Sequence, residues 1–354
     1  MAGADVVDWD LAVSVGSRLA PDGPALGWAE TFEAVAELRA LAVAAIAPVR
    51  ERSGLVADDS SAVTVIVDRP AWIASNVAGF RVVLEPLLER LRVQRGSNAV
   101  ITAVGSRATA VQMGGVLAYL SGKVLGQYEA FTVDPGSPGR LLLVAPNIVA
   151  TERALAVVPS DFRLWVCLHE ETHRVQFGAV PWLGDHLVGL IHFYLELTGT
   201  DAGEVLRRLR AALSGLTSSG RDGAPKPTLL DAAQTPEQRG VFDQLTALMS
   251  LLEGHADYVM DDVGPLVVPT VATIRERFQE RRTSPGLIDG VARRLLGLDA
   301  KLAQYADGAA FVRGVVQREG RDGFNQIWVA PENLPSRNEI ADPAAWCERV
   351  LNPS

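Results

Sequence analysis

One short segment of the chain carries residues whose types and spacing could perform hydrolysis. It reads His169-Glu170-Glu171-Thr172-His173, the pattern H-E-x-x-H. In a helix, side chains four positions apart lie on one face, so both imidazoles can bind a single cation. The glutamate that follows the first histidine then stands beside a water molecule on that cation and can accept its proton. The pattern therefore predicts a zinc site with His169 and His173 as ligands and Glu170 as general base.

A hydrolytic zinc site needs a third protein ligand and leaves one position open for water. Glu253 is the best candidate, because it lies on the edge of an apolar helical stripe and a carboxylate that faces the core needs compensation. The stripe consists of Leu245, Met249, Leu252, Ala256 and Val259. Its helix should begin at the capping box Thr235-Pro236-Glu237-Gln238 and reach about Asp262.

The residues around Glu253 suggest supporting roles. Asp257 shares its helical face and is expected to accept the outer N–H of a ligating histidine, which fixes the tautomer. Gly254 and Ala256 leave room for another helix to approach. His255 points roughly 200° around the helix from Glu253, so it is expected to be a hydrogen-bonded packing residue.

Other ligands compete with Glu253 for the third position. The rivals are His186, His192 and Glu196, of which Glu196 and His192 share a face of a plausible helix. The longer metzincin pattern fails, because Gln176 and Ala179 occupy its glycine and histidine places. The donor for the developing oxyanion stays open among Tyr258, Tyr305, His186 and His192. Cys167 is expected to be a buried apolar residue.

The elements that must position these residues are mostly helices, so the predicted fold class is mainly α with at most a small β-sheet. Helices are expected over Thr31–Arg52, Pro70–Arg92, Ala108–Leu125 and Asp161–Phe177, and Pro159-Ser160-Asp161 is expected to cap the last of them. Ala62–Val67 and Leu141–Val144 are the candidate strands.

The chain is predicted to have a mostly helical N-terminal region, residues 1–150, and a helical catalytic region, residues 151–354, in one continuous domain or two. Residues 214–235 are rich in Gly, Ser and Pro and should form a long loop. Such a loop is a lid over a cleft or an insertion, and disorder is favoured. A Pro-rich tail around residues 331–335 is expected to wrap the body.

The composition limits the partners. The chain has 354 residues and a formal charge of −9, so it lacks the basic surface that nucleic acid requires. No export signal is visible, and the apolar runs are shorter than the roughly 20 residues that span a membrane. The two cysteines form no C-x-x-C pair. These features favour a cytoplasmic protein with no nucleic-acid or membrane partner.

Several stretches together resemble a family of zincin-like metallopeptidases or hydrolases that is often associated by name with the biosynthesis of a deazaflavin coenzyme. The stretches are residues 67–72, 169–177, 253–257, 297–305 and 328–335, of which 253–257 reads E-x-x-A-D. The resemblance covers most of the chain. It implies a zincin-like fold and supports His169, His173 and Glu253 as zinc ligands, Glu170 as base and Asp257 behind the ligands. It supplies no substrate, and deazaflavin binding is not predicted.

The leading expectation is therefore a Zn²⁺-dependent hydrolase of peptide or small amide bonds. One alternative is a binding or regulatory protein of zincin shape that keeps the metal without turnover. Another is an all-α interaction protein in which the H-E-x-x-H pattern arises by chance.

Overall fold

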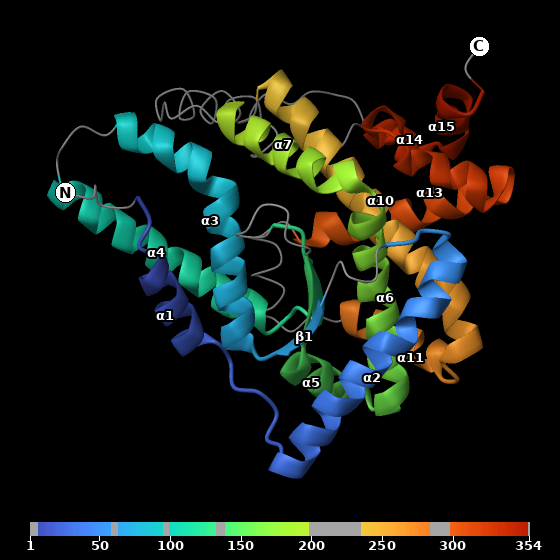
Figure 1. Cartoon of the computed structure of the whole chain (residues 1–354), viewed down its shortest axis with the longest axis horizontal. Coiled ribbons are helices and arrows are strands. Elements are labelled where there is room, and N and C mark those ends of the chain that lie inside the picture. The colour runs from blue at the N-terminus through green and yellow to red at the C-terminus, as the bar shows by residue number, and fades with distance from the viewer. Residues whose placement is uncertain are drawn as a thin grey trace, which may run out of the picture.

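The computed structural model describes residues 6–57, 63–94, 99–131, 139–197, 235–283 and 298–352 (Figure 1). The loop predicted at 214–235 lies outside these ranges except for its last residue. The Pro-rich segment 331–335 lies inside them and includes a short 3₁₀ turn, η2 (Pro331–Asn333).

Helices make up most of the described chain, which confirms the mainly α class. The N-terminal half contains α1 (Trp9–Leu19), α2 (Trp28–Ser53), α3 (Arg69–Gln94), α4 (Ala99–Ser121), α5 (Ala145–Leu155), α6 (Pro159–Ala179) and α7 (Pro181–Leu197). The C-terminal half contains α10 (Pro236–Val267), α11 (Val271–Thr283), α13 (Leu298–Phe324), the 3₁₀ turn η1 (Asn325–Trp328), α14 (Arg337–Ala341) and α15 (Pro343–Val350). The four helices predicted before residue 180 are all present, and the largest boundary difference is at α4, which begins nine residues early and ends at Ser121.

A small sheet runs through the middle of the molecule, in the order β1-β3-β2. β1 (Val63–Val67) and β3 (Arg140–Val144) pair in parallel and correspond to the two predicted strands. The antiparallel strand β2 (Gly126–Glu129) was not predicted. Its four residues, Gly-Gln-Tyr-Glu, show too short an alternation to signal a strand.

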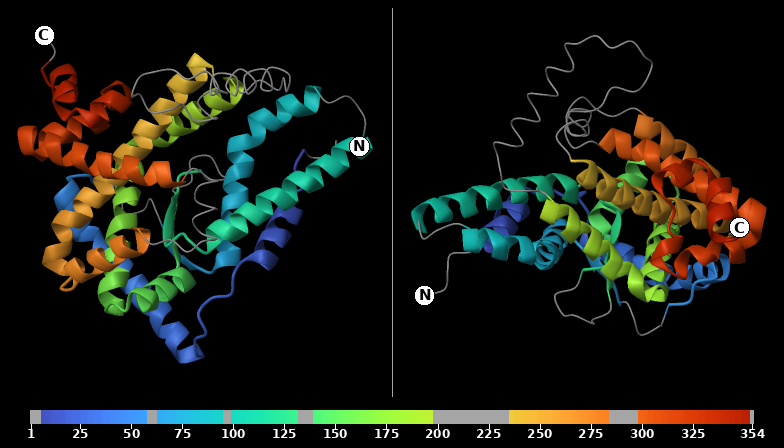
Figure 2. Two further views of the ribbon diagram at one scale, coloured as in Figure 1. Left: turned by 180° about the vertical axis from the view of Figure 1, so that it is seen from behind. Right: turned by 90° about the horizontal axis from the view of Figure 1, so that it is seen from above.

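The central strand β3 separates two apolar cores. Leu142 and Val144 face a smaller core formed with α1, α3 and α4, whereas Leu143 faces the larger core of α2, α6, α10 and α13. Successive residues of a strand point to opposite faces, which explains why one strand serves both cores. The left view in Figure 2 shows these two helical groups on either side of the sheet.

The larger core joins residues from both halves of the chain. α2 packs along α6, and Leu38, Ala42 and Val49 of α2 are buried in the same core as Phe162 and Leu168 of α6. The division into regions 1–150 and 151–354 stays a prediction.

The start of α6 differs from the expectation. The N-cap residue is Val158, which provides no side-chain hydrogen bond, and Pro159 takes the first helical position, where its missing N–H costs nothing. The Asp161 carboxylate instead accepts hydrogen bonds from the backbone N–H and hydroxyl of Thr270, at 2.9 and 2.6 Å. The acid in the first turn thus fastens α6 to the start of α11.

The start of α10 agrees with the expectation. The Thr235 side chain accepts a hydrogen bond from the Gln238 backbone, and the Gln238 side chain accepts one from the Thr235 backbone. α10 continues to Val267, beyond the predicted end near Asp262 and past Pro265. Within the predicted apolar stripe Leu252, Ala256 and Val259 are buried, but Met249 is 37% exposed.

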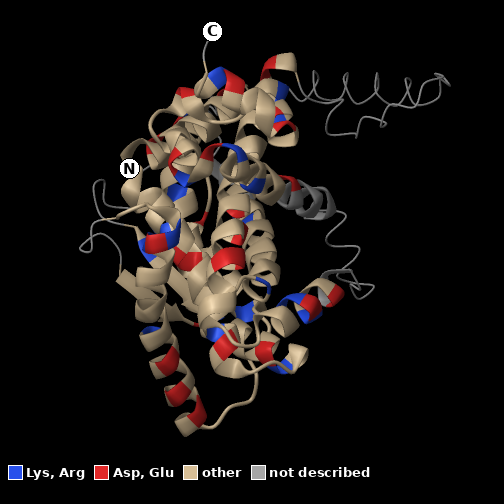
Figure 3. Ribbon diagram, turned by 90° about the vertical axis from the view of Figure 1, so that its right-hand side faces the viewer, with Lys and Arg blue, Asp and Glu red and all other residues tan. Residues whose placement is uncertain are grey.

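Basic and acidic residues are interspersed along the described ribbon (Figure 3). None of the helices in the described part of the chain combines the length and hydropathy that crossing a membrane requires. The predicted lack of a nucleic-acid partner stays a prediction.

α10 and α13 cross at Gly254 and Gly308. This agrees with the expectation that Gly254 leaves room for another helix to approach. A Cβ atom built on Gly254 would lie 2.2 Å from the backbone carbon of Gly308, and one built on Gly308 would lie 1.9 Å from the Ser250 carbonyl oxygen. Both contacts are with backbone, so neither side chain nor rotamer change can relieve them. The crossing fixes the depth at which α10 lies against its neighbours.

We expect Gly254→Ala to destabilise the protein by about 1–3 kcal/mol, because the added methyl group overpacks this crossing. The matched control is Gly240→Ala in the same helix, where a Cβ meets no atom within 4 Å. That control should gain roughly 0.5–1 kcal/mol from helix propensity. Denaturant unfolding measures both. Equal effects of the two substitutions would show that the α10–α13 crossing has been misassigned.

Candidate metal centre and active site

The two motif histidines project from one face of α6. Their Nε2 atoms lie 3.2 Å apart, and the rings are nearly perpendicular, at 87°. Ligand atoms about 2.1 Å from a tetrahedral zinc ion are separated from each other by about 3.4 Å. The spacing of the His169 and His173 nitrogens therefore fits a common ion.

Glu253 reaches the same point from α10. Its Oε2 lies 3.5 Å from His169 Nε2, and its Oε1 lies 3.8 Å from His173 Nε2. Ligand atoms of the three residues all lie within 4.8 Å of one another. The three side chains are only 13–26% exposed. Two nitrogens and one oxygen at these separations match the donor set and the spacing of a divalent metal site with an open position.

Electrostatics also favour a cation here. Burial lowers the pKa of His169, but the hydrogen bond and charge of Glu253, with Glu170 and Asp257, outweigh it and raise that pKa to about 9. Burial lowers the pKa of His173 despite the opposing charge of Glu253. The carboxylates of Glu170, Glu253 and Asp257 thus create a negative potential at the two histidines. A divalent ion would neutralise this potential more completely than a single proton.

Burial raises the pKa of Glu170 to about 7, with the charge of Glu253 adding to the effect and that of His169 opposing it. The carboxyl group therefore exchanges protons near neutral pH, as a general base requires. Its place depends on Gly126 of the unpredicted strand β2. A Cβ atom at position 126 would lie 2.5 Å from the Glu170 carboxyl carbon and 2.7 Å from its Oε1. Only glycine leaves Glu170 in this position.

Gln176 contacts the second histidine, a role that was not predicted from the sequence. Its Oε1 lies 2.9 Å from His173 Nδ1, and its Nε2 donates to the Leu252 carbonyl at 2.9 Å. The Nδ1–H group of His173 can donate to Gln176 Oε1, which leaves the Nε2 lone pair available to a metal ion. The spacing of three residues after His173 places Gln176 on the same helical face, and this signal could have identified it.

His255 lies behind this arrangement as a packing residue, as expected. Its Nδ1 is 3.0 Å from Gln176 Nε2, and its ring packs against Phe324 and Trp328. Burial lowers its pKa to about 3, so the ring is neutral and Nδ1 can accept the hydrogen bond from Gln176.

Asp257 lies one turn beyond Glu253, on the side of the first histidine. Its Oδ1 is 4.0 Å from His169 Nδ1. This distance is that of an ion pair and is longer than a hydrogen bond. The side chain thus lies on the outer side of the first histidine and acts on it through charge, without the predicted hydrogen bond.

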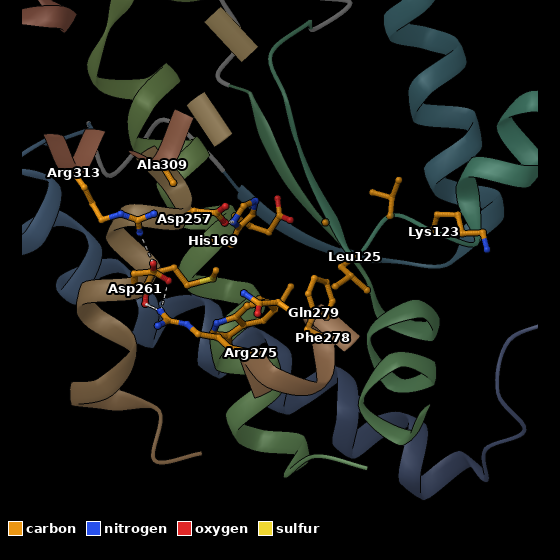
Figure 4. A pocket seen from close by; sticks show the side chains of 16 residues that line it. Lys123, Leu125, His169, Asp257, Asp261, Arg275, Phe278, Gln279, Ala309 and Arg313 are labelled. Carbon is orange, nitrogen blue, oxygen red and sulfur yellow. Dashed lines mark hydrogen bonds and ion pairs between the residues drawn. The ribbon is translucent and has the colours of Figure 1, made fainter. Parts of the chain in front are cut away.

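A cavity of about 470 Å³ opens beside this cluster (Figure 4). His169, Glu170 and Asp257 line it, so the proposed base faces space that a substrate could occupy. The other polar side chains of the wall are Lys123, Asp261, Arg275, Gln279 and Arg313, and the apolar ones include Leu125, Trp165, Met260 and Phe278. The arginines of this wall were not foreseen from the sequence.

The rival ligands lie elsewhere. Glu196 forms an ion pair with Arg90, and His192 Nε2 lies 2.9 Å from the Val83 carbonyl oxygen. His186 packs edge-on against Trp182 and lines a different cavity. None of these three belongs to the cluster around His169 and His173.

The tyrosines suggested as oxyanion donors are not found in the cavity wall among the described side chains. The Tyr258 hydroxyl accepts a hydrogen bond from Arg52, away from the cavity wall. Tyr305 lies in α13, but its side chain is outside the described part.

Cys167 is buried, and burial with the charges of Glu170 and Glu171 raises its pKa to about 12.

Comparison with known proteins agrees with this geometry. The family model for zincin-like metallopeptidases matches residues 7–347. This chain belongs to that family. The recognition made from its motifs is thereby confirmed, and the family supports a metal-dependent hydrolase.

A solved structure shares the architecture. It is a crystal structure from Chloroflexus aurantiacus, reported as a proposed hydrolase with a novel fold, and it is 30% identical to this chain. The alignment covers 98% of this zincin-like chain and 100% of the other, with a TM-score of 0.69. No curated protein matches significantly.

Glu253→Gln should weaken zinc binding by more than the 10–100-fold that follows loss of a group behind a ligand, because it removes the charged ligand itself. The matched control is Glu196→Gln, which makes the same chemical change on the rival acid that pairs with Arg90. Competition with a chelating dye measures both affinities. Loss of zinc in Glu196→Gln with retention in Glu253→Gln would reverse the assignment.

Zinc affinity should rise with pH. His169 must release its proton before it binds metal, and its pKa is about 9. Between about pH 7, where Glu170 also titrates, and about pH 9, each unit should strengthen apparent binding about tenfold, after which the curve flattens. Dye competition corrected for zinc hydrolysis measures this slope. A flat profile would contradict the protonation state assigned to His169.

Proposed function

We propose that this protein is a zinc-dependent hydrolase of peptide or amide bonds, with His169, His173 and Glu253 as zinc ligands and Glu170 as general base. The observation that carries the proposal is the meeting of two imidazoles and a carboxylate from a distant helix, next to a cavity lined by Glu170. Membership of the zincin-like metallopeptidase family supports the same reaction class.

Zinc at this point would lower the pKa of a bound water to about 7 and polarise the carbonyl of the substrate. The residues of the chain do the remaining work. Glu170, with a pKa of about 7, accepts the proton of the attacking water and delivers it to the leaving amine. Gly126 leaves Glu170 its place, and Gln176 orients the ring of His173.

The choice of zinc follows from the donor set. Two imidazoles and one carboxylate with an open position are the ligands of many catalytic zinc sites, although such sites also accept other divalent ions of the first transition row. The cavity of about 470 Å³ has room for a few residues of a peptide or for a small amide. We propose that the protein acts in the cytoplasm.

Glu170→Gln should reduce hydrolysis by about 10²–10⁴-fold, because the amide cannot accept a proton. Zinc content should stay near that of the wild type, since Glu170 is not a ligand. Cleavage of a quenched peptide library and metal analysis of the purified protein measure the two properties.

The charge-matched control is Glu276→Gln, an exposed acid on α11 outside the cavity wall, which should change neither property. Full activity in Glu170→Gln would overturn the role of the base. A wild type that binds zinc but cleaves no peptide or amide would favour a binding protein of zincin shape.

A further inference from the structure

Two arginines converge on one aspartate in the wall of the active-site cavity. Arg275 of α11 and Arg313 of α13 each form an ion pair with Asp261 of α10, the latter at 2.9 Å. All three residues line the same cavity as His169 and Glu170. Figure 4 shows the three side chains gathered together, with Lys123 lying apart from them.

The cluster lies at a defined separation from the metal ligands. Glu253, Asp257 and Asp261 recur every four residues and therefore follow one face of α10. At 1.5 Å per residue, Asp261 is about 12 Å along the helix axis from Glu253 and about 6 Å from Asp257. An extended peptide covers the roughly 12 Å from Glu253 to Asp261 with about three to four residues.

The charges of the cluster do not balance. Each oxygen of the Asp261 carboxylate receives one guanidinium, Oδ1 from Arg275 and Oδ2 from Arg313. Two positive groups thus share one negative group, which leaves an excess positive charge at this end of the cavity. At the other end, Glu253 and Asp257 face His169. The cavity is polarised along α10.

Unused donors accompany the excess charge. A guanidinium carries five N–H donors in a fixed fork. In the described part of the chain Arg275 bonds through Nη2 to Asp261 and the Met260 carbonyl, and its buried Nε has no hydrogen-bond partner. Arg313 contacts Asp261 through Nη1, and its side chain is 45% exposed. Planar carboxylates are the groups that such forks bind best.

An apolar wall accompanies the arginine pair. Trp165 and Phe278 meet edge to face with ring centroids 5.2 Å apart, and both line the cavity with Met260. A substrate that lies along this wall needs an apolar portion as well as an acidic one. The lining of the cavity therefore fits a substrate that has both an acidic group and an apolar group.

We propose that Arg275 and Arg313 form a specificity subsite for a carboxylate of the substrate, about three to four residues from the bond that is cleaved. This inference rests on the proposed peptide or amide hydrolysis and narrows its substrate class to acidic chains. The carboxylate is either that of an Asp or Glu side chain or that of the C-terminus, and both present the same planar oxyanion to the arginines.

The first experiment compares peptides that differ only in this charge. Blocked, internally quenched peptides carry Glu or Gln at each position in turn, and a second series has a free or an amidated C-terminus. The wild type should cleave the carboxylate form with kcat/KM higher by about tenfold or more, mainly through KM. The first series reports a side-chain carboxylate, and the second reports a terminal one.

The variants identify the residues responsible. Arg313→Gln and Arg275→Gln should each lose most of the preference while they still cleave the neutral peptide. The control is Arg318→Gln, because Arg318 is an exposed residue on the same helix as Arg313. This variant should retain the preference for the carboxylate. Arg313→Glu should shift the preference from Glu to Lys at the same position. This reversal cannot come from a general loss of structure.

A binding measurement separates this inference from the proposed function. Peptide hydroxamates that carry Glu or Gln at the third or fourth residue are titrated into zinc-loaded Glu170→Gln protein by calorimetry. Tighter binding of the Glu form that depends on Arg313 supports the subsite even if no peptide is cleaved, in which case only the function fails. Cleavage of peptides without any carboxylate preference would overturn the subsite and leave the function standing.

Discussion

The packing of α10 against α6 is the constraint on which the site depends. His173 and Glu253 are eighty positions apart in the sequence, and their side chains meet because two helices cross at a fixed depth. The Gln176 side chain bonds to the Leu252 carbonyl at this contact, so one residue both joins the helices and orients a histidine. α13 packs closely against α10 where Gly254 meets Gly308, and this contact also helps to fix the position of α10.

The same packing determines the electrostatics. Placing Glu170, Glu253 and Asp257 around two partly buried imidazoles brings several negative groups into a small volume of low polarity. Such a cluster is costly unless a cation neutralises it. The shifted pKa values of His169 and Glu170 record this demand. The metal binding and the proton transfer that we propose are therefore two consequences of one arrangement of charges.

α10 also positions residues of the cavity that lie beyond the proposed metal ligands. Glu253 faces the two histidines, and Asp257 faces Nδ1 of His169. Asp261 pairs with the two arginines. One helix thereby sets both the position of the proposed chemistry and the distance to the proposed acid-binding subsite. The edge strand β2 adds a separate condition, because Gly126 leaves room for the base.

The sequence by itself determined the helical class, two strands of the sheet and the pairing of His169 with His173 on one helical face. These features depend on local rules: four-residue spacing puts His169 and His173 on one face, and the capping box at Thr235 starts α10. The tertiary structure alone decided that Glu253 and not Glu196 meets the histidines, and that Arg275 and Arg313 share Asp261. Arginines that pair across helices look like any other surface charges in a sequence. Contacts between distant segments depend on how the helices pack, and spacing along the chain carries no record of that.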